Sequence, residues 1–177
     1  FGTFVLHGVT GSGKTEVYIK LIDEVIRQGK QALLLLPEIA LTAQIINRLR
    51  RYFGEKVGIY HSRFSMSQRA DVWKRTATTD ECRYQVLVGA RSALFLPFRD
   101  LALVIVDEEH DPSYKQQDPA PRYNARDAAI YLARMWGART VLGSATPSVE
   151  TYHNAMSGRY AYASMKRRYG GFSLPEV

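Results

Sequence analysis

The sequence predicts an α/β domain in which a parallel sheet is covered by helices on both faces. Two observations support this prediction. Short apolar runs alternate with helical patterns along the chain, and turn or capping residues separate them. At 177 residues, with 46% hydrophobic and 23% charged side chains, the chain has the size and composition of an ordinary soluble domain. We therefore expect residues 1–177 to form a single domain whose strands are joined by right-handed crossovers.

Short apolar segments are expected to form the strands of the sheet. Most are rich in Val, Ile and Leu and are bounded by Gly, Pro or polar residues, as Pro37 bounds the second. Strands of this kind, apolar along their whole length, are typical of a sheet buried on both faces. The expected strands are residues 3–7, 32–36, 57–60, 84–88, 103–106, 140–142 and 160–164.

Helical patterns with recognisable ends fill most of the segments between these strands. Apolar residues recur there at spacings of three and four, and glycines follow several of the patterns. Asn124 suits a helix cap, and Thr146 with Pro147 suits the cap and first turn of the last helix. A long irregular stretch, residues 111–123, is of the kind that is usually functional or mobile. The expected helices are residues 14–28, 41–53, a segment after Ser65, 124–136 and 146–157.

The composition excludes several classes of protein. The longest wholly apolar stretch, residues 101–106, is far shorter than the roughly 20 residues of a membrane-spanning helix. No signal peptide is visible, and the single cysteine, Cys82, excludes an internal disulfide or a cysteine-rich zinc site. We therefore expect a cytoplasmic protein with no membrane partner. The net charge of +7 favours a polyanionic partner such as nucleic acid, without proving one.

A glycine-rich turn stands between the first expected strand and the first expected helix. It matches the phosphate-loop pattern G-x-x-x-x-G-K-S/T without a departure. Glycines let backbone N–H groups turn toward phosphate oxygens, and the helix adds the positive end of its dipole. Lys14 is expected to reach the β- and γ-phosphates of ATP, and the Thr15 hydroxyl to ligate Mg²⁺. The expected nucleotide-binding residues are Gly8, Val9, Thr10, Gly11, Ser12, Gly13, Lys14 and Thr15.

The apolar segment at residues 103–106 is followed by three carboxylates and a histidine. At the carboxyl end of a parallel strand, Asp107 would lie beside the phosphate loop and hold Mg²⁺ through water. A carboxylate one residue later can orient or deprotonate an attacking water, which is the role expected of Glu108. Glu109 could equally be a solvated charge, and His110 a structural histidine rather than a catalytic one. The expected catalytic residues are Lys14, Asp107, Glu108 and His110.

Two of these segments resemble superfamily-two helicases and translocases. Residues 107–110 look like the D-E-x-H box of that family, in which the histidine couples the nucleotide site to bound nucleic acid. Residues 143–147 resemble its S-A-T motif, so Ser144, Ala145 and Thr146 are expected to link the ATP state to strand movement. Thr146 is also a suitable helix cap, and both roles can coexist. The resemblance implies a RecA-like phosphate-loop NTPase lobe that uses ATP and Mg²⁺.

Five further stretches keep a recognisable order along nearly the whole chain: residues 36–42, 61–62, 88–95, 113–117 and 122–127. Together they narrow the resemblance to the PriA family of primosomal replication-restart helicases. It implies the first RecA-like ATPase lobe of a 3′-to-5′ DNA helicase that reloads the replication machinery at stalled forks. In one departure, residues 118–121 occupy a stretch where this family commonly carries a tryptophan. Two prolines stiffen that loop and leave one less surface for base stacking.

Several residues are expected to face single-stranded DNA, which proteins grip through backbone charge and base stacking. Arg91 would contact phosphate, with Gly89 allowing close backbone approach. Pro37, Thr42 and Gln44 follow a strand tip, where a phosphate could meet backbone amides. An aromatic and basic cluster supplies the other candidates: Tyr114, Lys115, Arg122, Tyr123 and Arg126. From spacing alone, that cluster could instead be a helix-capping loop with ordinary surface charge.

A helicase needs two RecA-like lobes that close on ATP, and the second normally supplies arginines that stabilise charge on the transferring phosphate. The chain is too short to contain that lobe, and it lacks the family's zinc module and amino-terminal DNA-binding domains. We therefore interpret it as part of a larger protein and expect it to turn over ATP poorly alone. The resemblance implies single-stranded and forked DNA, the second lobe, and primosome or single-strand-binding proteins as partners.

Other functions remain as alternatives. A fork-reversal or restriction-type translocase of superfamily two would share the phosphate loop and the acidic box, although residues 91–95 and 113–117 favour the replication-restart family. A small-molecule kinase would need an arginine-bearing lid and an acceptor pocket. A non-enzymatic nucleotide switch is disfavoured by Asp107 and Glu108 together.

Overall fold

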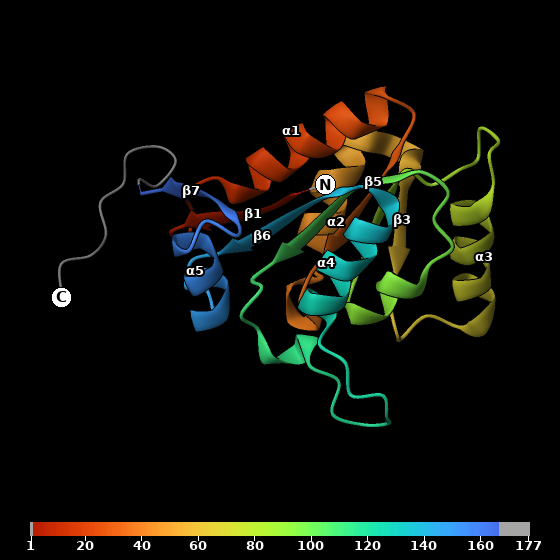
Figure 1. Cartoon of the computed structure of the whole chain (residues 1–177). Helices are drawn as coiled ribbons and strands as arrows, with labels where there is room; N and C mark the ends of the chain where they lie inside the picture. The colour runs from red at the N-terminus through yellow and green to blue at the C-terminus, as the bar shows by residue number, and fades with distance from the viewer. Residues whose placement is uncertain (1, 167–177) are drawn as a thin grey trace.

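The computed structural model describes residues 2–166, which form one sheet with helices on both of its faces (Figure 1). The strand order is β3-β4-β2-β5-β6-β1-β7, and every pairing is parallel. The expected α/β class with a parallel sheet is therefore confirmed. The strands are β1 (Gly2–Gly8), β2 (Gln31–Leu35), β3 (Val57–Tyr60), β4 (Val86–Gly89), β5 (Leu101–Asp107), β6 (Arg139–Ser144) and β7 (Ala161–Met165).

The α-helices and several short 3₁₀ turns connect these strands. Within residues 2–166, none of the helices has the length and apolar character needed to cross a membrane. The α-helices are α1 (Lys14–Arg27), α2 (Ala43–Phe53), α3 (Met66–Ala77), α4 (Ala125–Trp136) and α5 (Val149–Met156). The 3₁₀ turns are η1 (Glu38–Ala40), η2 (Gly54–Lys56), η3 (Arg91–Phe95) and η4 (Pro112–Tyr114).

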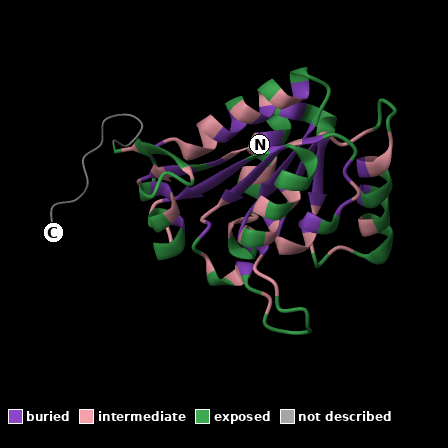
Figure 2. Cartoon of the chain, in the orientation of Figure 1, coloured by how far each residue is buried: buried purple, intermediate pink, exposed green. Residues whose placement is uncertain are grey.

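The core consists of two apolar clusters, one on each face of the sheet. Strand β2 is buried throughout and contributes alternately to both, because successive side chains of a strand point to opposite faces. Ala32 and Leu34 pack with α1 and α2, whereas Leu33 and Leu35 pack with α4 and η3. In Figure 2 the buried strands lie between helices whose outer surfaces are exposed. This double burial explains why residues 32–36, which include most of β2, form a continuous apolar run.

The ends of α4 lie where the sequence predicts them. Asn124 caps its start, since the Asn124 side chain accepts a hydrogen bond from the backbone N–H of Arg126. Gly137 ends it with a left-handed φ of 65°, a conformation that glycine adopts without strain.

Several other boundaries differ from the prediction, and three of these differences have a clear local cause. The helix expected from residue 41 begins at Ala43, because Thr42 is extended and η1 precedes it. The strand expected from residue 84 begins at Val86, since the Tyr84 N–H donates to the Arg75 carbonyl instead of joining the sheet. The expectation that Thr146 caps the last helix is wrong. Ser148 is the cap, and its hydroxyl accepts from the backbone N–H of Thr151.

The stretch at residues 111–123 is more ordered than its composition suggests. It contains η4, and Lys115 forms an isolated antiparallel bridge with Asn124. The Gln116 N–H also donates to the Tyr123 carbonyl at 2.9 Å, so the loop folds back on itself beside the start of α4.

The sheet topology determines where a ligand can bind. Because all strands are parallel, their carboxyl ends meet at one edge, where α/β proteins bind ligands. Strands β5, β6 and β1 are neighbours and end at Asp107, Ser144 and Gly8. The phosphate loop, the acidic box and the Ser-Ala-Thr segment therefore all leave the sheet at adjacent positions.

Candidate functional site

The glycine-rich turn after β1 forms a cradle. Gly11 and Gly13 have φ values of 78° and 92°, a region that favours glycine, and α1 begins at the next residue, Lys14. The Lys14 ammonium donates to the Gly8 carbonyl at 2.9 Å, so the lysine folds back over the turn. Among the described residues, the buried Ser12 hydroxyl has no hydrogen-bond partner. A phosphate oxygen would supply one, so the turn fits a phosphate group.

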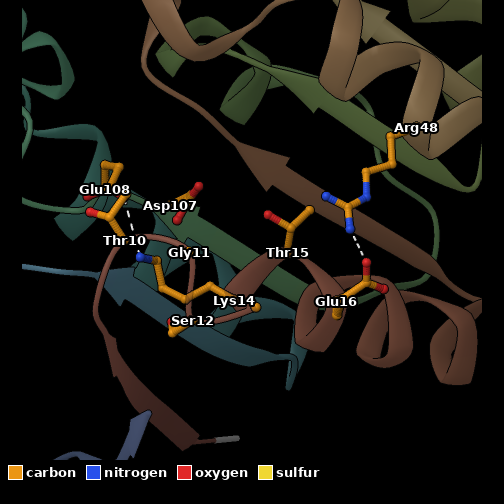
Figure 3. A pocket seen from close by; sticks show the side chains of 10 residues that line it. Thr10, Gly11, Ser12, Lys14, Thr15, Glu16, Arg48, Asp107 and Glu108 are labelled. Carbon is orange, nitrogen blue, oxygen red and sulfur yellow. Dashed lines mark hydrogen bonds and ion pairs between the residues drawn. The ribbon is translucent and has the colours of Figure 1, made fainter. Parts of the chain in front are cut away.

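A cavity of about 460 Å³ opens over this turn (Figure 3). Its lining combines the phosphate loop with the end of β5 and one residue of α2. The lining residues are Thr10, Gly11, Ser12, Gly13, Lys14, Thr15, Glu16, Arg48, Asp107 and Glu108. The structure thus brings most of the predicted nucleotide-binding residues together with the predicted acidic pair. It adds Glu16 and Arg48, which carry no recognisable motif in the sequence.

A buried tyrosine holds Asp107 in this cavity. The Tyr18 hydroxyl of α1 donates to Asp107 Oδ1 at 2.8 Å. Burial raises the pKa of the Asp107 carboxyl; the Tyr18 hydrogen bond and Lys14 partly offset this, and Glu108 adds to it. Burial, followed by the charge of Asp107, raises the pKa of Tyr18 well above its ordinary value. A divalent cation would favour the ionised carboxylate, which fits the Mg²⁺ role expected of Asp107.

Tyr18 and Gly143 act together at this point. A Cβ on Gly143 would overlap the Tyr18 hydroxyl and lie 3.2 Å from Asp107 Oδ1, so only glycine leaves room for their hydrogen bond. In the sequence Tyr18 occupies an ordinary core position of a helix, four residues after Lys14. Its role therefore depends on a contact with a distant segment that no local signal reveals.

A strained backbone turns Glu108 toward the phosphate loop. Its φ of 47° is uncommon for any residue other than glycine, and such strain often marks functional sites. The Glu108 carboxylate lies 3.6 Å from Lys14 Nζ and 3.7 Å from His110 Nδ1. The side chain predicted to orient water therefore borders the cavity.

His110 contacts the Ser-Ala-Thr segment directly. His110 Nδ1 lies 2.8 Å from the Ser144 hydroxyl, and Nε2 lies 3.5 Å from the Thr146 hydroxyl. The backbone N–H of Thr146 donates to the same Ser144 oxygen at 2.9 Å, which leaves the Ser144 hydrogen free to donate to His110. These contacts connect the acidic box to the segment predicted to report the ATP state.

Glu109 points away from the cavity and is not a solvated charge. Its side chain is fully buried, with an exposed fraction of 0%. It accepts hydrogen bonds from the Ser148 N–H at 2.6 Å, the Ser148 hydroxyl at 3.1 Å and the Thr151 hydroxyl at 2.9 Å. Arg126 donates to it at 3.2 Å. Glu109 thus ties the acidic box to the start of α5, and the solvated alternative is excluded.

Arg126 is the counter-ion of this buried carboxylate. Its side chain is 13% exposed and also donates to Ser148 Oγ and to Asp127 Oδ1, each at 2.8 Å. Burial alone would lower the pKa of the Arg126 guanidinium. Hydrogen bonds and charge from Asp127 and Glu109 outweigh this effect, so the pKa lies above its ordinary value. Because these contacts occupy the guanidinium, we do not retain Arg126 as a candidate DNA contact.

Tyr114 also lies in the core. It is 1% exposed, and its hydroxyl donates to the carbonyls of Leu35 at 3.1 Å and Asp107 at 2.7 Å. A ring packed in this way has no face free to stack on a base. We therefore replace the predicted DNA-facing role of Tyr114 with an internal one, in which it braces the ends of β2 and β5.

Two further candidates prove to be internal. Pro37 and Gly89 are buried at the ends of β2 and β4. A Cβ on Gly89 would meet the Tyr60 carbonyl oxygen and lie 2.8 Å from the Ala93 Cβ. The glycine therefore permits close packing inside the protein rather than the close approach of DNA that we predicted.

The remaining candidates lie closer to the surface. Thr42 and Gln44 are exposed at the start of α2. Arg91 is partly exposed and donates to the Ser113 carbonyl at 3.0 Å, which fastens it to the loop before Lys115.

A mixed aromatic and basic surface, which we call the loop surface, consists of Phe95, Lys115, Arg122 and Tyr123. The Lys115 ammonium donates to the Arg122 carbonyl at 2.6 Å. Phe95 and Tyr123 meet edge to face with ring centroids 5.4 Å apart, and Phe95 is 61% exposed. The sequence did not single out Phe95, because an apolar residue in a turn is usually a core residue.

The metal prediction rests on few protein ligands. Within residues 2–166, no group of three or more His, Cys, Asp or Glu side chains is placed to hold a metal ion. Mg²⁺ at a phosphate site takes most of its ligands from water and phosphate. A hydroxyl and a carboxylate suffice on the protein side, and Thr15 and Asp107 border the same cavity.

Comparison with known proteins gives consistent results. Residues 2–155 match the family model described as DEAD/DEAH box helicase. The replication restart protein PriA of Bacillus subtilis is 45% identical over 174 residues, which cover 98% of this chain and 21% of that protein. The PriA protein of Chlamydia pneumoniae is 46% identical over 168 residues, covering 95% of this chain and 22% of that protein. The chain therefore spans about a fifth of the length of these relatives.

Solved structures support the same fold. RecG bound to a three-way DNA junction matches with a TM-score of 0.65 and 22% identity, over 97% of this chain and 21% of that chain. A DEAD box protein from Methanococcus jannaschii matches with a TM-score of 0.62 and 18% identity, over 94% of this chain and 45% of that chain. At these identities the likeness concerns the fold alone.

Proposed function

Because this chain belongs to the DEAD/DEAH box helicase family, we propose that it is the ATP-hydrolysing lobe of a 3′-to-5′ DNA helicase that acts in replication restart at stalled forks. The observation that carries the proposal is the single cavity on which the phosphate loop and the acidic pair meet. The similarity to replication restart proteins, which covers nearly the whole chain, supports the DNA substrate and the cellular process.

Each cavity residue has a distinct task in this proposal. The loop amides and the Ser12 hydroxyl bind phosphate oxygens, and Lys14 leaves the Gly8 carbonyl to meet the β- and γ-phosphates. Thr15 and Asp107 would hold Mg²⁺, which would neutralise charge on the phosphates. Glu108 orients the attacking water and accepts its proton.

DNA binding is coupled to this chemistry through His110. Nδ1 of the His110 imidazole contacts Ser144 and lies 3.7 Å from the Glu108 carboxylate, while Nε2 lies near the Thr146 hydroxyl. A shift of the Ser-Ala-Thr segment would therefore reach the residue that orients water. Thr42, Gln44, Arg91 and the loop surface are the DNA contacts that we retain, since they combine hydrogen-bond donors, positive charge and exposed aromatic rings.

A second RecA-like lobe completes the site in this proposal. Phosphoryl transfer needs positive charge on both sides of the transferring group, and helicases of this kind draw arginines from a partner lobe. In the cavity, Lys14 and Arg48 face the carboxylates of Glu16, Asp107 and Glu108. We therefore propose that this lobe, without its partner lobe, binds ATP but hydrolyses it slowly. Forked DNA and primosome or single-strand-binding proteins would act on the full-length protein.

Calorimetric titration of the chain with Mg·ATP tests the nucleotide site. Lys14→Ala removes the ammonium that meets the terminal phosphates, so ATP affinity should fall by about tenfold or more. Lys20→Ala, at an exposed position of the same helix, is the matched control and should bind like the unaltered chain. Unchanged affinity in Lys14→Ala would refute the assignment of the phosphate loop.

Unwinding by the full-length protein that carries this lobe tests the proposed substrate. Forked DNA should be unwound faster than an unforked duplex of the same sequence, and only with ATP and Mg²⁺. Equal rates on both substrates would instead favour a general superfamily-two translocase.

A further inference from the structure

A histidine lies in β1 directly before the phosphate loop, and none of the roles assigned above uses it. His7 Nε2 lies 3.1 Å from the Ala145 carbonyl oxygen, and Nδ1 lies 2.7 Å from the Tyr162 hydroxyl. Ala145 is the middle residue of the Ser-Ala-Thr segment that follows β6, and Tyr162 belongs to β7. Strand β1 lies between β6 and β7 (Figure 1), so the imidazole connects the two neighbours of its own strand.

The two partners of the imidazole determine where its hydrogen lies. A carbonyl oxygen can only accept a hydrogen bond, so Nε2 carries the hydrogen and donates it to Ala145. In the neutral ring Nδ1 then has no hydrogen, and it accepts a hydrogen bond from the Tyr162 hydroxyl. Tyr162 therefore favours the tautomer of His7 that can bind Ala145.

Strand β7 is itself fastened to the phosphate loop. It pairs with β1 along its whole length, and the backbone N–H of Val9 donates to the Met165 carbonyl at 3.4 Å. The Tyr162 ring also meets the ring of Tyr152 in α5 edge to face, with centroids 6.4 Å apart. Contacts with two elements thus position Tyr162, which gives His7 a partner that is fixed relative to the phosphate loop.

The Ser-Ala-Thr segment lies between two histidines. His110 contacts the Ser144 hydroxyl and approaches that of Thr146. His7 donates to the carbonyl of the residue between them. His110 also lies near Glu108, the residue that orients the attacking water in the proposed mechanism. The bond from His7 therefore fixes the segment relative to the phosphate loop, in the position where it contacts His110.

We propose that His7, oriented by Tyr162, is a positioning residue that holds the Ser-Ala-Thr segment where it can couple DNA binding to ATP hydrolysis. This inference rests on the proposed helicase function and adds to it a residue outside the recognised motifs. An imidazole bound at both nitrogens is restrained from rotating, so it holds the Ala145 carbonyl more firmly than a mobile side chain would. Without this bond the segment would shift relative to the phosphate loop and transmit less of its movement to His110.

A purely structural role for His7 is the main alternative. Tyr162 is 40% exposed, and hydrogen bonds that compete with water contribute little to stability. A structural role predicts that loss of His7 lowers the rate of ATP hydrolysis by the same factor with and without DNA. The positioning role predicts a larger loss when DNA is bound.

Steady-state ATP hydrolysis by the full-length protein that carries this lobe, with and without single-stranded DNA, separates these roles. In His7→Ala the stimulation by DNA, the ratio of the two rates, should fall about fivefold, the size expected for the loss of one hydrogen bond. KM for ATP should change by less than about twofold, because the phosphate contacts remain. His7→Gln, whose amide can still donate to Ala145, should restore most of the stimulation.

A second substitution tests the orienting role of Tyr162. Tyr162→Phe should reduce the stimulation by DNA less than His7→Ala does, and the double variant should behave like His7→Ala alone. Tyr152→Phe keeps the ring that packs against Tyr162 and is the matched control, so it should behave like the unaltered protein. In nitrogen NMR spectra of this chain, neutral His7 should carry its proton on Nε2, and Tyr162→Phe should yield a mixture of both tautomers.

Three results would overturn the inference. They are unchanged stimulation by DNA in a folded His7→Ala, an equal fall of the rates with and without DNA, and a His7 proton on Nδ1 in the unaltered chain. The absence of DNA-stimulated ATP hydrolysis by the unaltered full-length protein would refute the proposed function itself, and with it this inference.

Discussion

The buried pair of Glu109 and Arg126 provides a sharp test of how this lobe is held together. Arg126→Ala removes the counter-ion from a carboxylate whose side chain is fully buried. Three hydrogen bonds from Ser148 and Thr151 would remain, but no positive charge would replace the guanidinium. Since the loss of one partner leaves an uncompensated charge in the interior, we expect a large destabilisation.

The magnitude follows from this burial. Removing one partner of a buried ion pair typically lowers the free energy of unfolding by about 3–5 kcal/mol. Domains of this size have a free energy of unfolding of about 5–15 kcal/mol, so the variant should lose a fifth or more of its stability. The midpoint temperature of thermal unfolding should decrease by an amount on the order of 10 °C. The Arg126 bond to Asp127 adds little, because that carboxylate is 61% exposed.

Urea unfolding followed by circular dichroism measures the effect, and a second substitution identifies its cause. Arg126→Ala combined with Glu109→Gln leaves no buried charge, and the glutamine oxygen can still accept from Ser148. The double variant should therefore recover most of the lost stability. Arg134→Ala, on the exposed side of α4, is the matched control and should unfold like the unaltered chain. A loss below about 1 kcal/mol in Arg126→Ala, or no recovery in the double variant, would refute the reasoning.

Two further substitutions test the cavity. Burial raises the pKa of Asp107, so ionising this carboxyl lowers the free energy of unfolding. The loss grows as pH rises above the unfolded carboxyl pKa of about 3.9. Asp107→Asn should therefore stabilise the nucleotide-free chain at pH 8, with a gain in urea unfolding that shrinks toward pH 4; a gain independent of pH would contradict this. Gly143→Ala forces a methyl group against the Tyr18 hydroxyl and should cost about 1–3 kcal/mol, measured by the same unfolding assay. Tyr18→Phe in that background should recover part of the loss, and an additive loss would exclude the clash as its cause.

The features that could be predicted are those specified by neighbouring residues. The phosphate loop depends on glycines, a lysine and a threonine at adjacent positions, and it folds where the motif predicts. Asn124 and Gly137 end α4 because a cap needs only its own residue type and the nearest backbone groups. The prediction for Thr146 was wrong for a related reason, since Ser148 two residues later is an equally good cap and also has Glu109 as a partner.

Local sequence patterns were enough to predict the parallel α/β fold, the phosphate loop and the acidic strand end, because periodicity and motifs act over a few residues. Packing between distant segments, in contrast, sets which basic and aromatic side chains reach the surface. Tyr114 and Arg126 have residue types that suit DNA, yet Tyr114 is buried against Leu35 and the Arg126 guanidinium is paired with Glu109, and both partners are distant in the chain. Arg48 and Glu16 become a pair only because α1 and α2 pack together on one face of the sheet. Burial and pairing depend on such long-range contacts, which residue type and spacing do not encode.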